Sequence, residues 1–232
     1  MEKNPEKVRM LESVKNYISQ FVTDRDHGRK QVDDILHAMD KVDRKYFIDH
    51  DSYVDTALSI GHGQTISQPS TVARVLMLAA LSPGHDVLEI GFGSGWNACL
   101  IAYLVYPGKV TSAEIVPELV ELARRNLEII KKNIDAGERF SRLEIIHENI
   151  FEIPHGTYDR IIATAGVSPH NVSKIENLAD QLLKENGIIV CPYQRGPMMV
   201  MRKTNGRVKT QFTQEQYAFV PLILLGVKQD AD

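Results

Sequence analysis

The chain has 232 residues with a formal net charge of −3, and 43% of them are hydrophobic and 25% charged. These values are typical of a globular protein of one large domain, or one domain with an added lobe. The charge excludes an overall basic field that would attract nucleic acid or an anionic membrane. No apolar run reaches the ~20 residues that span a bilayer, and the charged N-terminal sequence lacks the apolar stretch of a signal peptide. We therefore expect a cytoplasmic protein without nucleic-acid or membrane partners.

The first third of the sequence is mostly helical. Apolar residues at helical spacing predict a helix over 4–21 and a shorter one over 32–42, with a break at 27–31 between them. An irregular, aromatic stretch follows, and then the polar segment SIGHGQTISQPS at 59–70. Ser70 is the predicted N-cap of the next helix, which ends near residue 81. We expect residues 1–69 to form a helical lobe beside the rest of the chain.

Strands and helices alternate from residue 86 onward. The predicted strands cover 86–91, 109–115, 142–149, 158–165, 187–193 and 198–204, with a last one over 217–227. The predicted helices cover 95–106, 117–133 and 171–186, the last of them closed by Gly187 as a C-cap. This alternation predicts an α/β fold, a doubly wound and mostly parallel sheet over residues 70–232. Asn205-Gly206 predicts a hairpin turn and therefore an antiparallel edge.

The two cysteines, Cys99 and Cys191, each lie among apolar residues. This surrounding predicts small buried thiols rather than a disulfide or a metal site.

A glycine-rich loop, VLEIGFGSG at 87–95, follows a predicted strand and opens a helix. Its glycines let the backbone turn tightly and approach a ligand closely, and ligands of such sheets bind beyond the carboxyl ends of the strands. Glu114 ends the next predicted strand, about 20 residues after the loop, where a carboxylate can accept both hydroxyls of a ribose. The pattern predicts a cofactor that contains adenosine, bound by the loop, Glu114 and the adjoining Ile115.

Two cofactors are compatible with this loop. The segment from Gly93 to Ala98 fits the dinucleotide pattern G-x-G-x-x-G/A. Glu89 followed by Gly91, Gly93 and Gly95 is instead the form common in S-adenosylmethionine-dependent methyltransferases. We therefore expect S-adenosyl-L-methionine, while an NAD-dependent oxidoreductase and a turn that binds nothing stay open as alternatives.

Four stretches together resemble the protein-L-isoaspartate (D-aspartate) O-methyltransferase family. They are IGHGQTISQP, VLEIGFGSGW, YDRIIATA and FVPL, and the resemblance extends from about residue 32 to 222, with GQTISQP as its specific part. It implies methyl transfer from S-adenosylmethionine to the free α-carboxylate of isoaspartyl residues in damaged proteins or peptides. The ester then collapses to a succinimide that hydrolyses partly to normal aspartate. It also implies the methyltransferase type of doubly wound sheet with extra N-terminal helices.

The resemblance assigns roles to the segment at 59–70, which would clamp both cofactor and acceptor. Ser67 matches the serine treated as the active-site residue of the family motif. An acceptor carboxylate with a pKa near 4 is already ionised at pH 7, so we expect Ser67 to orient it with a hydrogen bond, without a base or a metal. His62 is expected to be structural. The implied or predicted cofactor-binding residues are Gln64, Thr65, Ile66, Ser67, Glu89, Gly91, Gly93, Gly95, Glu114, Ile115, Glu148 and Asn149.

The sequence departs from the family in two places near the expected site. His147-Glu148-Asn149 stands where Gly-Asp-Gly is usual, so Glu148 still accepts from the adenine amino group while Asn149 reshapes the adenine pocket. The stretch TAGVSP at 164–169 differs on the acceptor side. Trp96 either stacks near the cofactor or packs within its helix. Substrate range therefore stays open between a general repair enzyme, an enzyme of one dedicated peptide and a non-catalytic binder. Oligomeric state also stays open.

Overall fold

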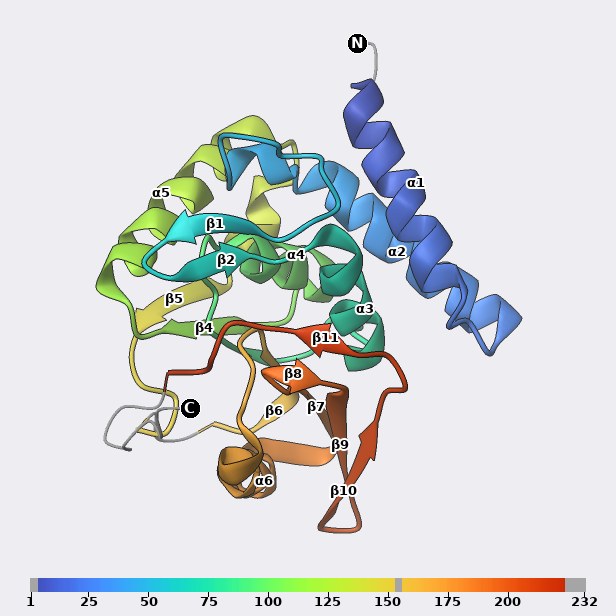
Figure 1. The fold of residues 1–232 in the computed structure, drawn as a ribbon, viewed down its shortest axis with the longest axis vertical. Helices are drawn as coiled ribbons and strands as arrows, with labels where there is room; N and C mark the ends of the chain where they lie inside the picture. The colour runs from blue at the N-terminus through green and yellow to red at the C-terminus, as the bar shows by residue number, and fades with distance from the viewer. Residues whose placement is uncertain (1–3, 153–155, 224–232) are drawn as a thin grey trace.

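The computed structural model describes residues 4–152 and 156–223. A seven-stranded sheet lies at its centre, in the order β10-β9-β7-β6-β3-β4-β5 (Figure 1). Its strands are β3 (Val87–Ile90), β4 (Val110–Glu114), β5 (Leu143–His147), β6 (Tyr158–Ala163), β7 (Leu183–Pro192), β9 (Met198–Thr204) and β10 (Arg207–Phe212). Strands β3 to β7 are all parallel to one another. Strand β9 is antiparallel to β7, and β10 is antiparallel to β9. The predicted α/β fold with its antiparallel edge is confirmed.

Helices cover both faces of the sheet (Figure 1). One face packs against α4 (Trp96–Val105) and α5 (Pro117–Asn133), and the other against α6 (Val172–Leu182). Successive side chains of a strand point to opposite faces, so on β3 Val87 joins the first core and Leu88 the second. A strand buried on both faces is apolar almost throughout, and Glu89 is the exception in β3.

The N-terminal helices pack on the α4 face of the sheet. They are α1 (Pro5–Ser19) and α2 (Arg25–Lys41), followed by the short 3₁₀ helix η1 (Arg44–Tyr46) and by α3 (Pro69–Ala79). Buried residues of these helices belong to the same hydrophobic core as α4, α5 and the sheet. The lobe therefore has no separate core among the described residues, and the boundary between residues 69 and 70 stays a prediction. Two further 3₁₀ helices are η2 (Gly137–Phe140) and η3 (Pro169–Asn171).

The predicted helix break at 27–31 is wrong, because α2 runs through it from its N-cap Asp24. The break lies earlier, between Gln20 and Asp24. Gly28 sits inside the helix, where an added Cβ would come within 2.5 Å of Val22 Cγ1. Gly28 therefore lets the preceding loop pack closely against the helix, and it does not end the helix.

Two other helix ends also differ from the prediction. Helix α3 begins at Pro69 with Gln68 as N-cap, so Ser70 is not the cap. The Ser70 N–H instead donates to Asp55 Oδ1 at 2.9 Å, which satisfies a first-turn donor without a local cap. At the other end of the domain, α6 stops at Leu182 and β7 begins directly.

Gly187 is therefore not a helix cap. The pairing of β6 with β7 jumps from Tyr158↔Leu183 to Arg160↔Ile188, so residues 184–187 interrupt the regular register of the two strands. A Cβ on Gly187 would lie 2.7 Å from the Lys184 carbonyl oxygen, which explains the glycine.

Hairpins account for much of the remaining chain. Asn205 and Gly206 both have positive φ (52° and 70°) between β9 and β10, which confirms the predicted turn. A second hairpin, β1 (Leu58–Gly61) with β2 (Gln64–Ile66), was not predicted. The expected last strand shrinks to β11 (Tyr217–Ala218), paired with β8 (Arg195–Gly196). Its predicted end at 224–227 lies outside the described residues.

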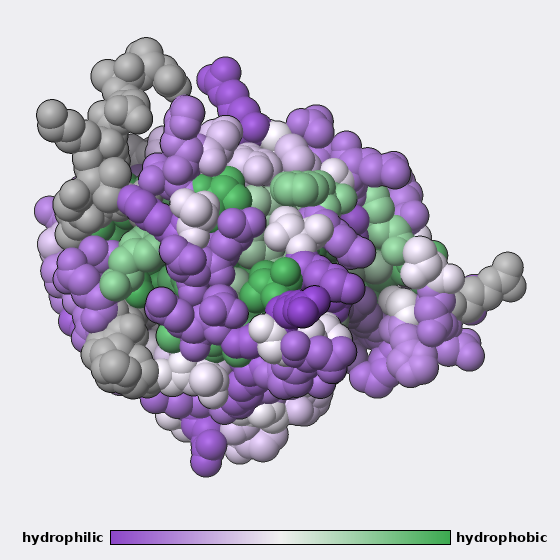
Figure 2. Space-filling view, turned by 90° about the horizontal axis from the view of Figure 1, so that it is seen from below, coloured by the Kyte–Doolittle hydropathy of each residue, from purple (hydrophilic) through white to green (hydrophobic). Residues whose placement is uncertain are grey.

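The face of the molecule seen from below is mainly hydrophilic (Figure 2). Figure 2, which views the molecule from below, shows polar residues over most of that face with smaller hydrophobic areas between them. The exposed large hydrophobic residues belong to separate parts of the chain; they are Val54, Ile129, Phe151 and Phe212. Both cysteines are buried and free, as predicted. Across the described ranges, no helix has the length and apolar character needed to cross a membrane.

Candidate active site

A cavity with about 840 Å³ of empty space, partly open to solvent, lies where β3, β4, β5 and β6 end. This is the switch point of the sheet, because the chain winds from β3 through β4 to β5 in one direction and then crosses to β6 on the other side of β3. Strand β2 (Gln64–Ile66) and residues 220–223 line the cavity as well. All the predicted site residues line it except Glu89 and Gly95.

The glycine loop forms the cavity wall between β3 and α4. Gly91, Gly93 and Gly95 all have positive φ, of 83°, 54° and 86°, a conformation that favours glycine. A Cβ on Gly93 would come within 3.2 Å of Ile60 Cδ1 in the hairpin. Gly93 therefore lets the hairpin lie directly over the loop. Gly95 instead allows the start of α4 to approach α5, since a Cβ added there would lie 3.0 Å from the Cβ of Ala123 in α5.

Glu114 reaches into this loop from the end of β4. Its Oε1 accepts from the N–H groups of Ile115 and Val116 at 2.8 and 3.1 Å, and its Oε2 accepts from Gly93 N–H at 3.1 Å. These bonds fix the carboxylate in one orientation. A carboxylate oxygen accepts about two hydrogen bonds, so Oε2 retains room for a hydroxyl donor from the cavity.

Glu89 lies behind the loop instead of in the cavity. It is fully buried on the α4 side of β3, where it accepts from Asn97 Nδ2 at 2.8 Å and Ser112 Oγ at 2.6 Å. Burial raises the pKa of this carboxyl to about 7, against the two hydrogen bonds that lower it. Asn97 itself lines the cavity, and its buried Oδ1 has no hydrogen-bond partner in the described part of the chain. This amide therefore offers a ligand an unused acceptor.

The carboxyl end of β5 supplies the side of the cavity predicted for adenine. Glu148 N–H donates to the Glu114 carbonyl at 3.1 Å, which holds the two acidic residues side by side. His147 Nε2 lies 3.2 Å from the carbonyl oxygen of Ile115. The Asn149 side chain accepts from Phe151 N–H and donates to Glu152. The amide of Asn149 is thus engaged with the turn that follows it.

Ser67 also lines the cavity and is half-buried between β2 and α3. Its carbonyl oxygen accepts from Arg44 Nη2 at 3.3 Å. His62 is at the exposed tip of the hairpin, with φ of 55°, and does not line the cavity. Trp96 is buried and also lines the cavity, and its indole N–H donates to the carbonyl of Val42 in the N-terminal lobe at 2.9 Å.

Two stretches of cavity wall were missing from the predicted residues. Thr164 donates its hydroxyl to the carbonyls of Ile90 and Gly91. Residues 220–223 line the cavity because the chain pairs there with Gly166. Gly166 N–H donates to the Val220 carbonyl at 2.8 Å, and Leu222 N–H donates to the Gly166 carbonyl at 2.7 Å. The stretches TAGVSP and FVPL contain these residues and were noted in the sequence, but nothing in either stretch indicates that the two contact each other.

No group of His, Cys, Asp and Glu side chains that could hold a metal ion occurs within residues 4–152 and 156–223.

Comparison with known proteins gives a consistent result. Residues 16–225 match the family model described as protein-L-isoaspartate(D-aspartate) O-methyltransferase. A protein of that name from Methanothrix thermoacetophila is 44% identical over 227 residues, covering 94% of each chain. Another from Methanococcoides burtonii is 38% identical over 198 residues, or 82% of this chain and 91% of the relative. A crystal structure from Plasmodium falciparum, described as a β-aspartate methyltransferase in complex with S-adenosyl-L-homocysteine, superposes with a TM-score of 0.75 at 26% identity, covering 96% of this chain and 99% of that one.

Proposed function

Because the chain belongs to the protein-L-isoaspartate (D-aspartate) O-methyltransferase family, we propose that the residues lining its cavity bind the methyl donor and the isoaspartyl acceptor of this reaction. The enzyme is an S-adenosylmethionine-dependent protein carboxyl methyltransferase. Its acceptor is the free α-carboxylate of an L-isoaspartyl residue in a damaged protein or peptide, and the ester formed there leads to repair through a succinimide. The partners of the enzyme are accordingly proteins or peptides that contain isoaspartate.

The residues around the cavity fit an adenosine-containing methyl donor. Glu114 would accept a ribose hydroxyl at Oε2, and Glu148 would accept from the adenine amino group. Gly91 and Gly93 let the donor approach the main chain of the loop. Asn97 Oδ1 supports this fit, because it is a buried acceptor on the cavity wall without a partner in the described chain. The bound cofactor supplies a methyl group on an electrophilic sulfonium.

The acceptor side needs little chemistry from the protein. An acceptor carboxylate is ionised at neutral pH and is its own nucleophile. Ser67 would donate a hydrogen bond to one carboxylate oxygen and so direct the other toward the methyl group. Gln64, Thr65 and Ile66 would line the methionine end of the cofactor. The hairpin over the loop would exclude water and hold the two reactants in line.

One observation carries this proposal: Ser67 and Glu114 line the same cavity. Glu89 would act from behind the loop by holding the Asn97 amide in place. Gly95 would act through the contact between α4 and α5.

The deciding experiment measures methyl transfer from labelled S-adenosylmethionine to two short peptides that differ only in an isoaspartyl or aspartyl residue. We expect base-labile label on the isoaspartyl peptide alone. Label on neither peptide, with S-adenosylhomocysteine still bound, would favour an enzyme of one dedicated peptide or a non-catalytic binder. The stretches at 147–149 and 164–169 would then be the first places to examine.

A further inference from the structure

Arg44 is a fully buried arginine between the helical lobe and the cavity. Its guanidinium donates to four main-chain carbonyls. Nη1 binds those of Ser52 and Val54 at 3.1 and 3.3 Å, and Nη2 binds those of Thr56 and Ser67 at 3.1 and 3.3 Å. One side chain thus joins the loop at 52–56 to the residue proposed to orient the acceptor.

This arrangement needs an arginine. The guanidinium carries its donors in a rigid planar fork, whereas a lysine ammonium is a compact point charge. Over the described residues the structure shows no ion pair between Arg44 and a carboxylate. Carbonyl dipoles surround the cation, and the Trp96 ring centroid lies 5.3 Å from its Cζ. Burial lowers the pKa of Arg44 to about 10, so it stays charged at neutral pH.

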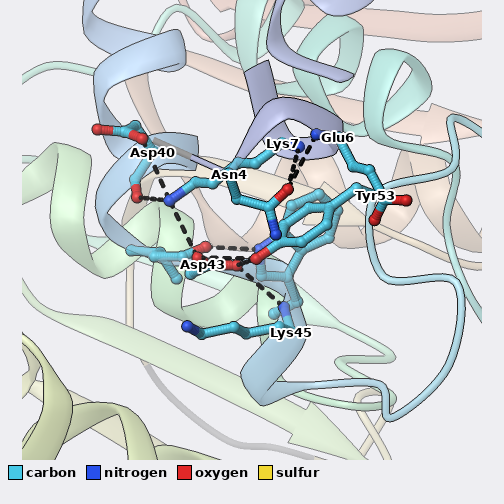
Figure 3. Close-up of polar contacts among 9 residues, drawn as sticks. Asn4, Glu6, Lys7, Asp40, Asp43, Lys45 and Tyr53 are labelled. Carbon is cyan, nitrogen blue, oxygen red and sulfur yellow. Dashed lines mark hydrogen bonds and ion pairs between the residues drawn. The ribbon is translucent and has the colours of Figure 1, made fainter. Parts of the chain in front are cut away.

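A polar cluster that includes Asp43 and Lys45, the chain neighbours of Arg44, holds the backbone of this segment in place (Figure 3). Asp43 is the N-cap of η1, and its carboxylate accepts from Lys45 N–H at 3.2 Å and from the Tyr53 hydroxyl at 2.9 Å. Lys7 of α1 lies 3.0 Å from Asp43 Oδ2 and 3.1 Å from Asp40 Oδ1. Helices α1 and α2 therefore set the position of both η1 and the loop that Arg44 binds.

The same loop also holds the chain beyond Ser67. Asp55 Oδ1 accepts from Ser70 N–H at 2.9 Å, and its Oδ2 accepts from the Ser13 hydroxyl of α1 at 3.1 Å. The main chain is thus fixed at Ser67 through Arg44 and three residues later through Asp55. Between these two points Ser67 lines the cavity.

We propose that Arg44, with the loop at 52–56 that it holds, is the positioning residue for the acceptor side of the reaction. It fixes the main chain at Ser67 and so aims the Ser67 hydroxyl, without touching acceptor or cofactor. This inference rests on the proposed function of Ser67. It separates the acceptor side, which depends on Arg44, from the cofactor side, which depends on Glu114 and the glycine loop.

The test compares Arg44→Lys with Arg160→Lys. Arg160 is a matched control, because it also donates to main-chain carbonyls, but those belong to Ala79 and Ala80, which do not line the cavity. Both proteins are first checked for folding by thermal unfolding. We expect Arg44→Lys to lower kcat/KM for an isoaspartyl peptide by roughly tenfold or more, since small misplacements are costly in catalysis, and Arg160→Lys to leave it unchanged.

Binding measurements give a readout separate from turnover. By calorimetry, Arg44→Lys should bind S-adenosylhomocysteine as the unmodified protein does, while its affinity for the isoaspartyl peptide in the presence of S-adenosylhomocysteine falls. Equal peptide kinetics in the two lysine variants would overturn the proposal. If Arg44→Lys does not fold, Asp55→Ala decides instead, because it releases the same loop from Ser70. Unchanged peptide kinetics in Asp55→Ala would then reject the proposal.

Ser67→Ala separates the two levels of inference. If it reduces turnover while Arg44→Lys matches its control, only the role of Arg44 fails. If Ser67→Ala leaves turnover unchanged, the proposed function of Ser67 fails, and the inference about Arg44 falls with it.

Discussion

The carboxylate of Glu114 is held by three main-chain N–H groups before any ligand is considered. Spacing along the sequence suffices to place this residue at the end of its strand. Its orientation depends on Gly93, which approaches from the neighbouring loop. A preorganised acceptor of this kind binds a hydroxyl without first losing side-chain freedom.

Glu114→Ala should therefore weaken cofactor binding. Loss of a charged hydrogen-bond partner costs about 1.5–3 kcal/mol, which is roughly 10–150-fold in Kd for S-adenosylhomocysteine. Calorimetry measures this directly. Glu118→Ala is the control, since Glu118 is exposed on the first turn of α5. Equal affinities of the two variants would contradict the ribose assignment.

Ser67→Ala should reduce turnover but not cofactor affinity, because Ser67 is proposed to act on the acceptor alone. We expect kcat on an isoaspartyl peptide to fall by roughly 10–100-fold. Steady-state kinetics at saturating cofactor test this, with the exposed Ser19→Ala as control. A full rate in Ser67→Ala would remove the hydroxyl from the mechanism.

Glu89 should make the stability of the protein depend on pH. Its pKa is raised by burial from 4.5 to about 7, so the folded state binds its proton more tightly than the unfolded state does. The stabilising contribution is complete below about pH 4.5 and is lost as the pH rises through about 7, a difference of about 3 kcal/mol at most.

Glu89→Gln removes this titration and keeps the shape of the side chain. The free energy of unfolding, measured in urea at pH 5 and pH 8, should consequently fall less with rising pH in Glu89→Gln than in the unmodified protein. The same pH dependence in both proteins would show that Glu89 does not titrate in this range.

At the scale of elements, hairpin β1–β2 and the glycine loop form one binding surface. The hairpin turn, His62-Gly63, has positive φ at both residues, as two-residue hairpin turns of type I′ require. The hairpin was not predicted because its strands are short and polar. Its position over Gly93 follows from packing, which brings Ile60 to the loop.

Gly93→Ala should disturb this surface. Gly93 and Gly84 both have positive φ, so alanine at either position should cost about 1–2 kcal/mol in backbone strain. Only at Gly93 does the added Cβ meet another group, whereas nothing lies within 4 Å at Gly84. We expect both variants to lose stability by thermal unfolding, but only Gly93→Ala to bind S-adenosylhomocysteine more weakly. Similar affinities in both would separate the hairpin from the cofactor site.

At the scale of the whole molecule, the N-terminal helices and the sheet share one hydrophobic core. The Tyr17 hydroxyl of α1 lies 2.9 Å from that of Tyr217 in β11, and Arg74 of α3 pairs with Glu215 at 3.0 Å. These contacts connect the beginning of the chain to the segment that leads to residues 220–223 of the cavity wall.

The protein should accordingly unfold in a single cooperative transition. Circular dichroism in the far and near ultraviolet, recorded during urea unfolding, should give coincident curves. A separate early transition would indicate that the lobe at 1–69 unfolds as a domain of its own.

Local patterns were enough to predict most elements of the sheet domain. Helix α5 and strand β9 have their predicted bounds, because their apolar periodicity and their turn residues lie within a few positions of each other. The glycine loop and Glu114 could be placed for the same reason. Resemblance to a family, rather than spacing, pointed to Ser67.

Contacts between distant segments could not be read from the sequence. Gly28 looks like a helix break until Val22 is seen packed against it, and Arg44 looks like an ordinary surface arginine until it meets Ser67. The sequence by itself determined the fold class, the loop and the acidic residues of the cofactor side, since these depend on neighbours along the chain. Only the tertiary structure decided which carbonyls Arg44 binds and which segments close the cavity, because those contacts form when hydrophobic burial brings remote parts of the chain together.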